Sequence, residues 1–147
     1  MAHARQQIRD AVATALGSID EVGDNVYTSH VYPVDRLPAL VITTPSETYL
    51  EEASAMGDDQ AFLLDLEVRV LAKAESDTVD DLLDTIAAKV QAALAADDTL
   101  GGRVLNLITT ETEVEIDAEG EQPIGVATTT WSCIYRIDPA DPETLTH

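Results

Sequence analysis

The chain has 147 residues, and its 28 acidic and 8 basic residues give a formal net charge of −20. A length close to that of one ordinary domain lets a single core bury roughly two-thirds of the unfolded chain's surface, so neither disulfides nor a structural metal are needed for folding. The single cysteine excludes an intrachain disulfide and any zinc or iron–sulfur site held by several thiolates. Because only two lysines and six arginines are scattered along the chain, we expect no conventional binding of DNA or RNA.

The first half of the chain predicts one helix and three strands. Apolar residues from Ile8 to Leu16 recur at steps of three and four, which predicts an amphipathic helix over 4–16. The β-rich segments 26–32 and 39–43 follow, and 45–59 is interpreted as a strand extension with an exposed loop. The segment 60–73 alternates apolar and polar residues, which predicts a strand with one buried and one solvated face.

The second half predicts one helix and two strands. A helix begins near Ser76 or Asp77, either of which can cap it, and ends by Asp97. After a turn at 101–102, the chain enters a strand over 104–117, and a hairpin leads into a last strand over 125–137. Four carboxylates project from one face of the first of these strands: Glu111, Glu113, Glu115 and Asp117.

This element order, α-β-β-β-α-β-β, predicts an α+β fold with a mostly antiparallel sheet of four to five strands and two helices packed on one face. The other face of the sheet is expected to stay partly uncovered. Residues 1–137 are expected to form a single domain, and the proline-interrupted residues 138–147 an extended or disordered tail. Since no apolar run approaches the roughly 20 residues of a membrane span, and the start lacks a signal sequence, we expect a soluble, non-secreted protein with no membrane partner.

The residue types argue against enzymatic chemistry. Two of the three histidines, His3 and His147, lie at the chain ends, and His30 has no catalytic partner near it in the sequence. Cys133 lies beside Trp131 on the apolar side of the last strand, where a cysteine acts as a small hydrophobe. Glycine loops that bind phosphate are absent. We therefore expect no enzyme, no cofactor and no metal.

The acidic strand face at 111–117 has several interpretations. Successive carboxylates on one face lie roughly 6.5 to 7 Å apart, and facing water they cost little. The simplest interpretation is thus a solvated strand face. Alternatives are a lining that repels nucleic acid, a surface complementary to a charged partner, or a weak cation site.

As a whole, the pattern resembles the tail terminator proteins, also called minor tail or tail completion proteins, of long-tailed bacterial and archaeal viruses. The resemblance spans residues 5–137 and depends on the order of its motifs. Two features depart from the family pattern, since His30 stands where an arginine is more usual and the net charge is unusually negative. The resemblance begins with the first helix and continues through five short segments, with the long alternating strand and the second helix after the second segment. These segments are Val31-Tyr32-Pro33, Leu37-Pro38-Ala39-Leu40-Val41, Leu100-Gly101-Gly102, Gly125-Val126-Ala127 and Tyr135-Arg136.

The resemblance implies a non-enzymatic assembly protein of the virion tail or neck. Its copies would form a ring, with six as the expected number, on the last ring of tail tube protein. The ring would stop tail elongation and present a surface to the head-side connector, or stopper, protein. DNA would pass through the hole without specific binding, repelled by acidic side chains such as those at 111–117, and assembly would take place in the host cytoplasm.

Termination requires one ring face that matches the tube and an opposite face that accepts no further tube subunit. The candidate contact elements are the 45–59 loop, with Tyr49, Leu50 and Met56 as apolar anchors, and the 111–122 hairpin, which ends at Gln122. Tyr49 and Leu50 could equally be core residues. Two other functions stay open: a different neck or tail component, such as a head-closure or tube protein, and a small acidic enzyme or cation-binding module.

Overall fold

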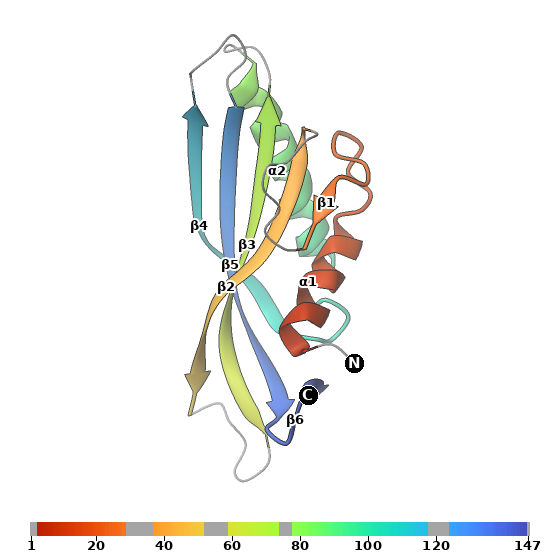
Figure 1. Cartoon of the computed structure of the whole chain (residues 1–147), viewed down its shortest axis with the longest axis vertical. Coiled ribbons are helices and arrows are strands. Elements are labelled where there is room, and N and C mark those ends of the chain that lie inside the picture. Colours follow the sequence, from red (N-terminus) through yellow and green to blue (C-terminus); the bar gives the residue numbers. More distant parts are fainter. Residues whose placement is uncertain (1–2, 29–36, 52–58, 74–77, 118–123, 147) are drawn as a thin grey trace.

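The structure of the chain is a computed structural model, and it describes residues 3–28, 37–51, 59–73, 78–117 and 124–146. A long, twisted sheet carries two helices on one of its faces (Figure 1). No helix in these ranges is long and apolar enough to cross a membrane. The elements in chain order are α1 (Ala4–Ala15), β1 (Val26–Tyr27), β2 (Ala39–Leu50), β3 (Gln60–Lys73), α2 (Val79–Ala96), β4 (Leu105–Asp117), β5 (Ile124–Asp138) and β6 (Asp141–Thr146).

The predicted α+β class is confirmed, with the predicted order of helices and strands. The strands lie in the order β1-β2-β3-β5-β4, and β6 pairs with β5. Among the strands of the described residues, only the β1–β2 pair is parallel. The described part of the sheet has six strands, one more than the upper number expected, because residues of the predicted extended or disordered tail form β6.

The two helices form where apolar residues recur on one face. In α1, the His3 side chain accepts a hydrogen bond from the Arg5 backbone N–H at 3.0 Å and so caps the helix, while Ile8 and Val12 face the sheet. In α2, the buried positions follow steps of three and four, and two aspartates in its first turn suit the positive end of the helix dipole. The predicted caps at 76 and 77 lie outside the described residues. The buried stripe of α2 is Val79, Leu83, Ile86, Val90 and Leu94.

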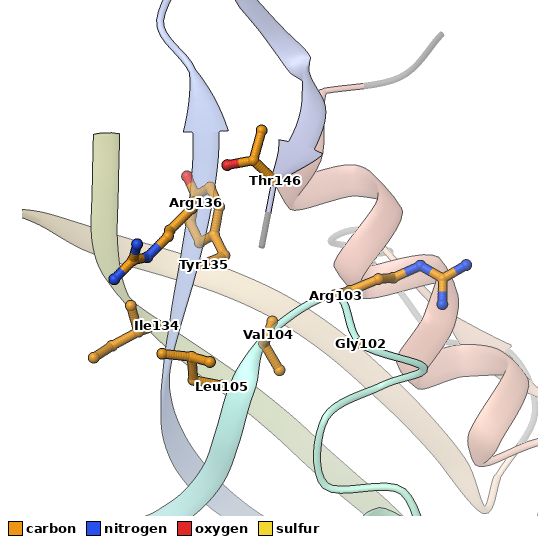
Figure 2. Close-up of a pocket in the computed structure, with 8 residues that line it drawn as sticks. All are labelled: Gly102, Arg103, Val104, Leu105, Ile134, Tyr135, Arg136 and Thr146. Carbon is orange, nitrogen blue, oxygen red and sulfur yellow. The ribbon is translucent and has the colours of Figure 1, made fainter. Parts of the chain in front are cut away.

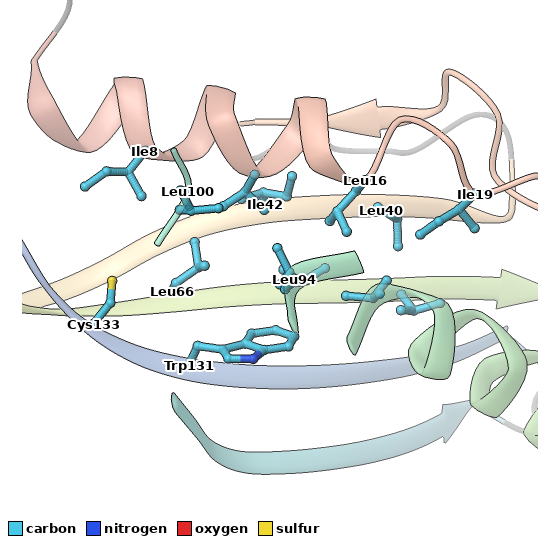
Figure 3. Packing of buried hydrophobic residues seen from close by; sticks show 14 of the residues in the cluster. Ile8, Leu16, Ile19, Leu40, Ile42, Leu66, Leu94, Leu100, Trp131 and Cys133 are labelled. Carbon is cyan, nitrogen blue, oxygen red and sulfur yellow. The ribbon is translucent and has the colours of Figure 1, made fainter. Parts of the chain in front are cut away.

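The core lies between these helices and the three central strands β2, β3 and β5 (Figure 3). The alternation predicted for 60–73 is confirmed, since Leu64, Leu66 and Val68 are buried and the intervening residues are partly exposed. On β5, Trp131 and Cys133 are buried on the same side. We call the side of the sheet that carries the helices the helix side, and the opposite side the open side.

Three β-bulges change which way side chains point. One extra residue lies in β2 between Thr43 and Ser46, where a proline cannot donate to the ladder. Two more lie in β4, between Leu105 and Ile108 and between Thr109 and Glu111. Each bulge shifts the alternation by one residue, so the two shifts in β4 cancel and only the residues between them, Ile108 and Thr109, point to the opposite side from that expected.

Candidate functional site

β4 is the strand that the rest of the chain leaves most exposed. It ends the strand order on one side of the sheet, so one edge of its backbone faces no other strand of the described chain. Its residues from Ile108 to Ile116 are all exposed. Because an ordinary edge strand buries at least one face, exposure of both faces marks β4 as the candidate surface for contact with another molecule.

Two apolar side chains of β4 are exposed on the helix side. Val114 lies opposite Ala127 and Ile116 lies opposite Gly125, both of which are buried residues of β5. Val114 is nevertheless 48% exposed and Ile116 40% exposed. The reason is that α2 packs over β3 and β5 and makes little contact with β4.

Two further apolar side chains of β4 lie on the open side, and a bulge accounts for the position of one of them, Ile108. Leu105 lies opposite Ile134 and Ile108 lies opposite Ser132, so both share the side of the sheet that carries no helix. They are 57% and 61% exposed. The simple alternation of the sequence would have placed Ile108 on the helix side. With Val114 and Ile116 on the helix side and Ile108 on the open side, β4 exposes apolar surface on both of its faces.

Three of the four acidic residues predicted to share a face, Glu111, Glu113 and Glu115, share the open side. They lie opposite alternate residues of β5, from Thr130 to Val126, and the backbone of Asp117 continues the register opposite Ile124. The three glutamates are exposed, and in the described part of the chain none of the three has an ion-pair partner. They form an uncompensated negative strip along the edge of the sheet.

The acidic residues of β3, which is separated from β4 by β5, have polar partners. Asp65 accepts hydrogen bonds from the hydroxyls of Ser46 at 2.8 Å and Ser132 at 3.4 Å. Glu67 lies 3.7 Å from the Arg69 guanidinium. The negative charge of the open side is therefore compensated toward its centre and uncompensated at the β4 edge.

A cavity interrupts the same edge of the sheet, and we call it the edge notch. β4 pairs with β5 as far as Ile134, and β6 pairs with β5 from Arg136, so a gap lies between the two strand ends (Figure 2). Its volume is about 280 Å³. The residues that line it include Arg103, Val104, Leu105, Ile134, Arg136 and Thr146.

The predicted anchors Tyr49 and Leu50 lie at the end of β2, in the part of the sheet that extends beyond the helices (Figure 1). Tyr49 is 49% exposed, and its ring meets that of Phe62 edge to face at 5.8 Å. Leu50 is half-buried. The other two predicted contact residues, Met56 and Gln122, lie outside the described residues.

A buried tyrosine connects this region to α1. The Tyr135 ring stacks on Phe62 at 5.5 Å, and its hydroxyl donates a hydrogen bond to Glu47. Glu47 in turn lies 3.1 Å from the Arg5 guanidinium. Burial, with the carboxylate of Glu47 beside the hydroxyl, raises the pKa of Tyr135. This network fixes the base of the β2–β3 extension.

No residue in the described ranges has the surroundings of a nucleophile or a metal ligand set. Burial raises the pKa of the Cys133 thiol to about 12, which keeps it protonated and unreactive. Within those ranges, no group of histidine, cysteine, aspartate and glutamate side chains is placed to hold a metal ion. His30 lies outside them.

Sequence reasoning missed the edge notch and the exposed apolar residues of β4. The composition of 104–108, which is mostly apolar, signals a buried strand and gives no sign of the bulges. The pairing of β6 that completes the notch is hidden by the prolines of the C-terminal segment, which are tolerated on an edge strand.

Several solved structures are similar to this chain. One, from the virion of a native gene transfer agent particle, has a TM-score of 0.46 and 15% sequence identity, and the match covers 86% of this chain and 94% of that chain. Another is the gp17 protein of bacteriophage SPP1, with a TM-score of 0.44, 18% identity, and coverage of 88% of this chain and 90% of that chain. No family model and no curated protein sequence matches the chain.

Proposed function

We propose that this chain is a structural subunit of a virion, and that its copies close into a ring that caps the tail tube of a long-tailed virus. The single observation that carries the proposal is β4, an edge strand with apolar side chains exposed on both faces. Such a strand makes a monomer prone to aggregate, and a neighbouring copy covers it when copies of the chain join in a closed assembly. The sequence resemblance to tail terminator proteins supports this particular kind of assembly.

The geometry favours a ring over a symmetric dimer. β4 forms one edge of the sheet, whereas the other edge carries the two-residue strand β1, so the two edges offer different surfaces. Contacts between two different surfaces repeat from copy to copy and close when the rotation per copy divides a full turn. Six copies is the number that the resemblance implies.

In this ring, the part of the acidic strip with Glu111 and Glu113 would face the hole. These exposed carboxylates would give the channel a negative lining, which repels DNA phosphates and lets DNA pass without binding. Reversal of Glu111 and Glu113 to lysine should make assembled rings retain duplex DNA in a salt-dependent way. Rings that bind DNA no better after this change would contradict the placement of the strip.

The β2–β3 extension would contact the last ring of tube protein. Tyr49 is the exposed aromatic side chain at its end, and the Tyr135–Glu47–Arg5 network makes its base rigid. The opposite ring face would meet the head-side connector. The proposal needs no catalytic residue, cofactor or metal.

The ring can be tested with the purified chain. Sedimentation and electron microscopy at rising protein concentration, with and without tail tubes, should show discrete closed rings that bind tube ends. Tubes of unlimited length would identify a tube protein instead. A chain that stays monomeric at every concentration, tubes included, would contradict the proposal.

A further inference from the structure

The edge notch holds two cations that the described part of the chain leaves without carboxylate partners. Arg103 donates a hydrogen bond to the Leu100 carbonyl at 2.8 Å, and Arg136 makes neither a hydrogen bond nor an ion pair with the described residues. In contrast, Lys89 is paired with Glu21. In a chain with 28 acidic residues, two such arginines at one small cavity form a marked local excess of positive charge.

A buried hydroxyl in the notch also lacks a partner. The Oγ1 atom of Thr146 is inaccessible to solvent and makes no hydrogen bond in the described structure. Figure 2 shows this hydroxyl directed toward β5, with Arg103 and Arg136 extending to opposite sides of the notch. This hydroxyl is closed off from solvent, so the groups of the notch that an incoming molecule can meet are the exposed Arg103 and the partly exposed Arg136, one on each side. A carboxylate pairs well with such guanidinium groups.

The acidic strip of the same molecule cannot supply that carboxylate. Asp117 lies opposite Ile124, and the notch lies at Tyr135. Residues 124 to 135 of one strand span roughly 37 Å at about 3.4 Å per residue, which far exceeds the length of any side chain. The acidic end of β4 can therefore meet a notch only on another molecule.

We propose that the edge notch receives the acidic end of β4, with Glu115, from a second copy of this chain. The exposed side chain of Leu105 at the rim would be covered by the same contact. Each copy then offers a notch to one neighbour and an acidic end to the other, which is the head-to-tail arrangement of a closed ring. This inference rests on the ring proposed above and names the residues that join its subunits.

Charge reversal on each side tests the contact. Arg136→Glu and Glu115→Lys each place like charges opposite one another, so each variant alone should raise the dissociation constant between copies about tenfold or more. An equimolar mixture of the two variants should assemble, because alternate copies again present opposite charges. Asp84→Lys, on an exposed position of α2, is the matched control for the change in net charge and should assemble like the unmodified chain.

Sedimentation velocity measures all four samples, and melting temperatures verify that each variant is folded. Assembly restored in the mixture supports the contact. Rings that form equally well in both single variants would overturn the inference and leave the ring itself standing. Loss of assembly without recovery in the mixture would also overturn it, because the effect would then lie within one chain. A chain with Arg136→Cys and Glu115→Cys should form disulfides only between copies. Folded assemblies in which no such disulfide forms would count against the contact.

Discussion

The exposed side chains of β4 separate assembly from folding, and replacing Val114 and Ile116 by threonine should affect only assembly. Threonine suits a strand and keeps the branched shape of both residues. Full burial of such a side chain is worth about 1.5–3 kcal/mol, so covering the 40–48% that the single chain leaves exposed should contribute about 1 kcal/mol per residue. The double variant should lose about 2 kcal/mol per contact, which weakens each contact roughly thirtyfold.

The assay compares the melting temperature at low concentration with the dissociation constant from sedimentation. Val68→Thr on β3, where the side chain is buried, is the control for folding and should lower the melting temperature by several degrees. The double variant should instead melt close to the unmodified chain and assemble poorly. Normal assembly of the double variant, or a melting temperature lowered as far as in Val68→Thr, would refute the reasoning that β4 is an interface.

Three further predictions concern the core. The Cys133 thiol, with a pKa of about 12, should react with a thiol reagent only after unfolding. Because its pKa in the folded chain exceeds the ordinary value of 9.0, its contribution to stability should be present below pH 9 and lost as the pH rises toward 12. The Cys133→Ala variant should reduce this pH dependence of stability. Tyr135→Phe removes a buried hydrogen bond and should cost about 1 kcal/mol of unfolding free energy, so an unchanged denaturant midpoint would contradict the network. Gly125→Ala would place a Cβ 2.6 Å from Leu83 Cδ1 and should destabilise the chain by about 1–3 kcal/mol, whereas Gly17→Ala, with 3.4 Å to its nearest neighbour, should be nearly neutral in the same denaturation experiment.

Local pattern predicted most of the fold because most of the fold obeys local rules. The strand at 60–73 and both helices have a single apolar face that one core covers, so the periodicity of their apolar residues is enough to predict the element and its buried face. The side of β4 that bears the three glutamates was also predicted, because no bulge interrupts the strand after Glu111.

The candidate contact surface could be predicted only in part, for two physical reasons. A bulge adds one residue without any sequence signal strong enough to reveal it, so the outward direction of Ile108 could not be derived. The exposure of Val114 depends on how far α2 extends across the sheet, which is a tertiary property. The pairing of β6, and with it the edge notch, likewise depends on a long-range contact with β5.

The most direct test of the central claim is the length of viral tails assembled with and without this protein, measured by electron microscopy. If copies of the chain form the ring that ends the tube, tails made in its presence should share one length, and tails made in its absence should continue to grow and vary widely. Tails of uniform length in both preparations would contradict the proposed function.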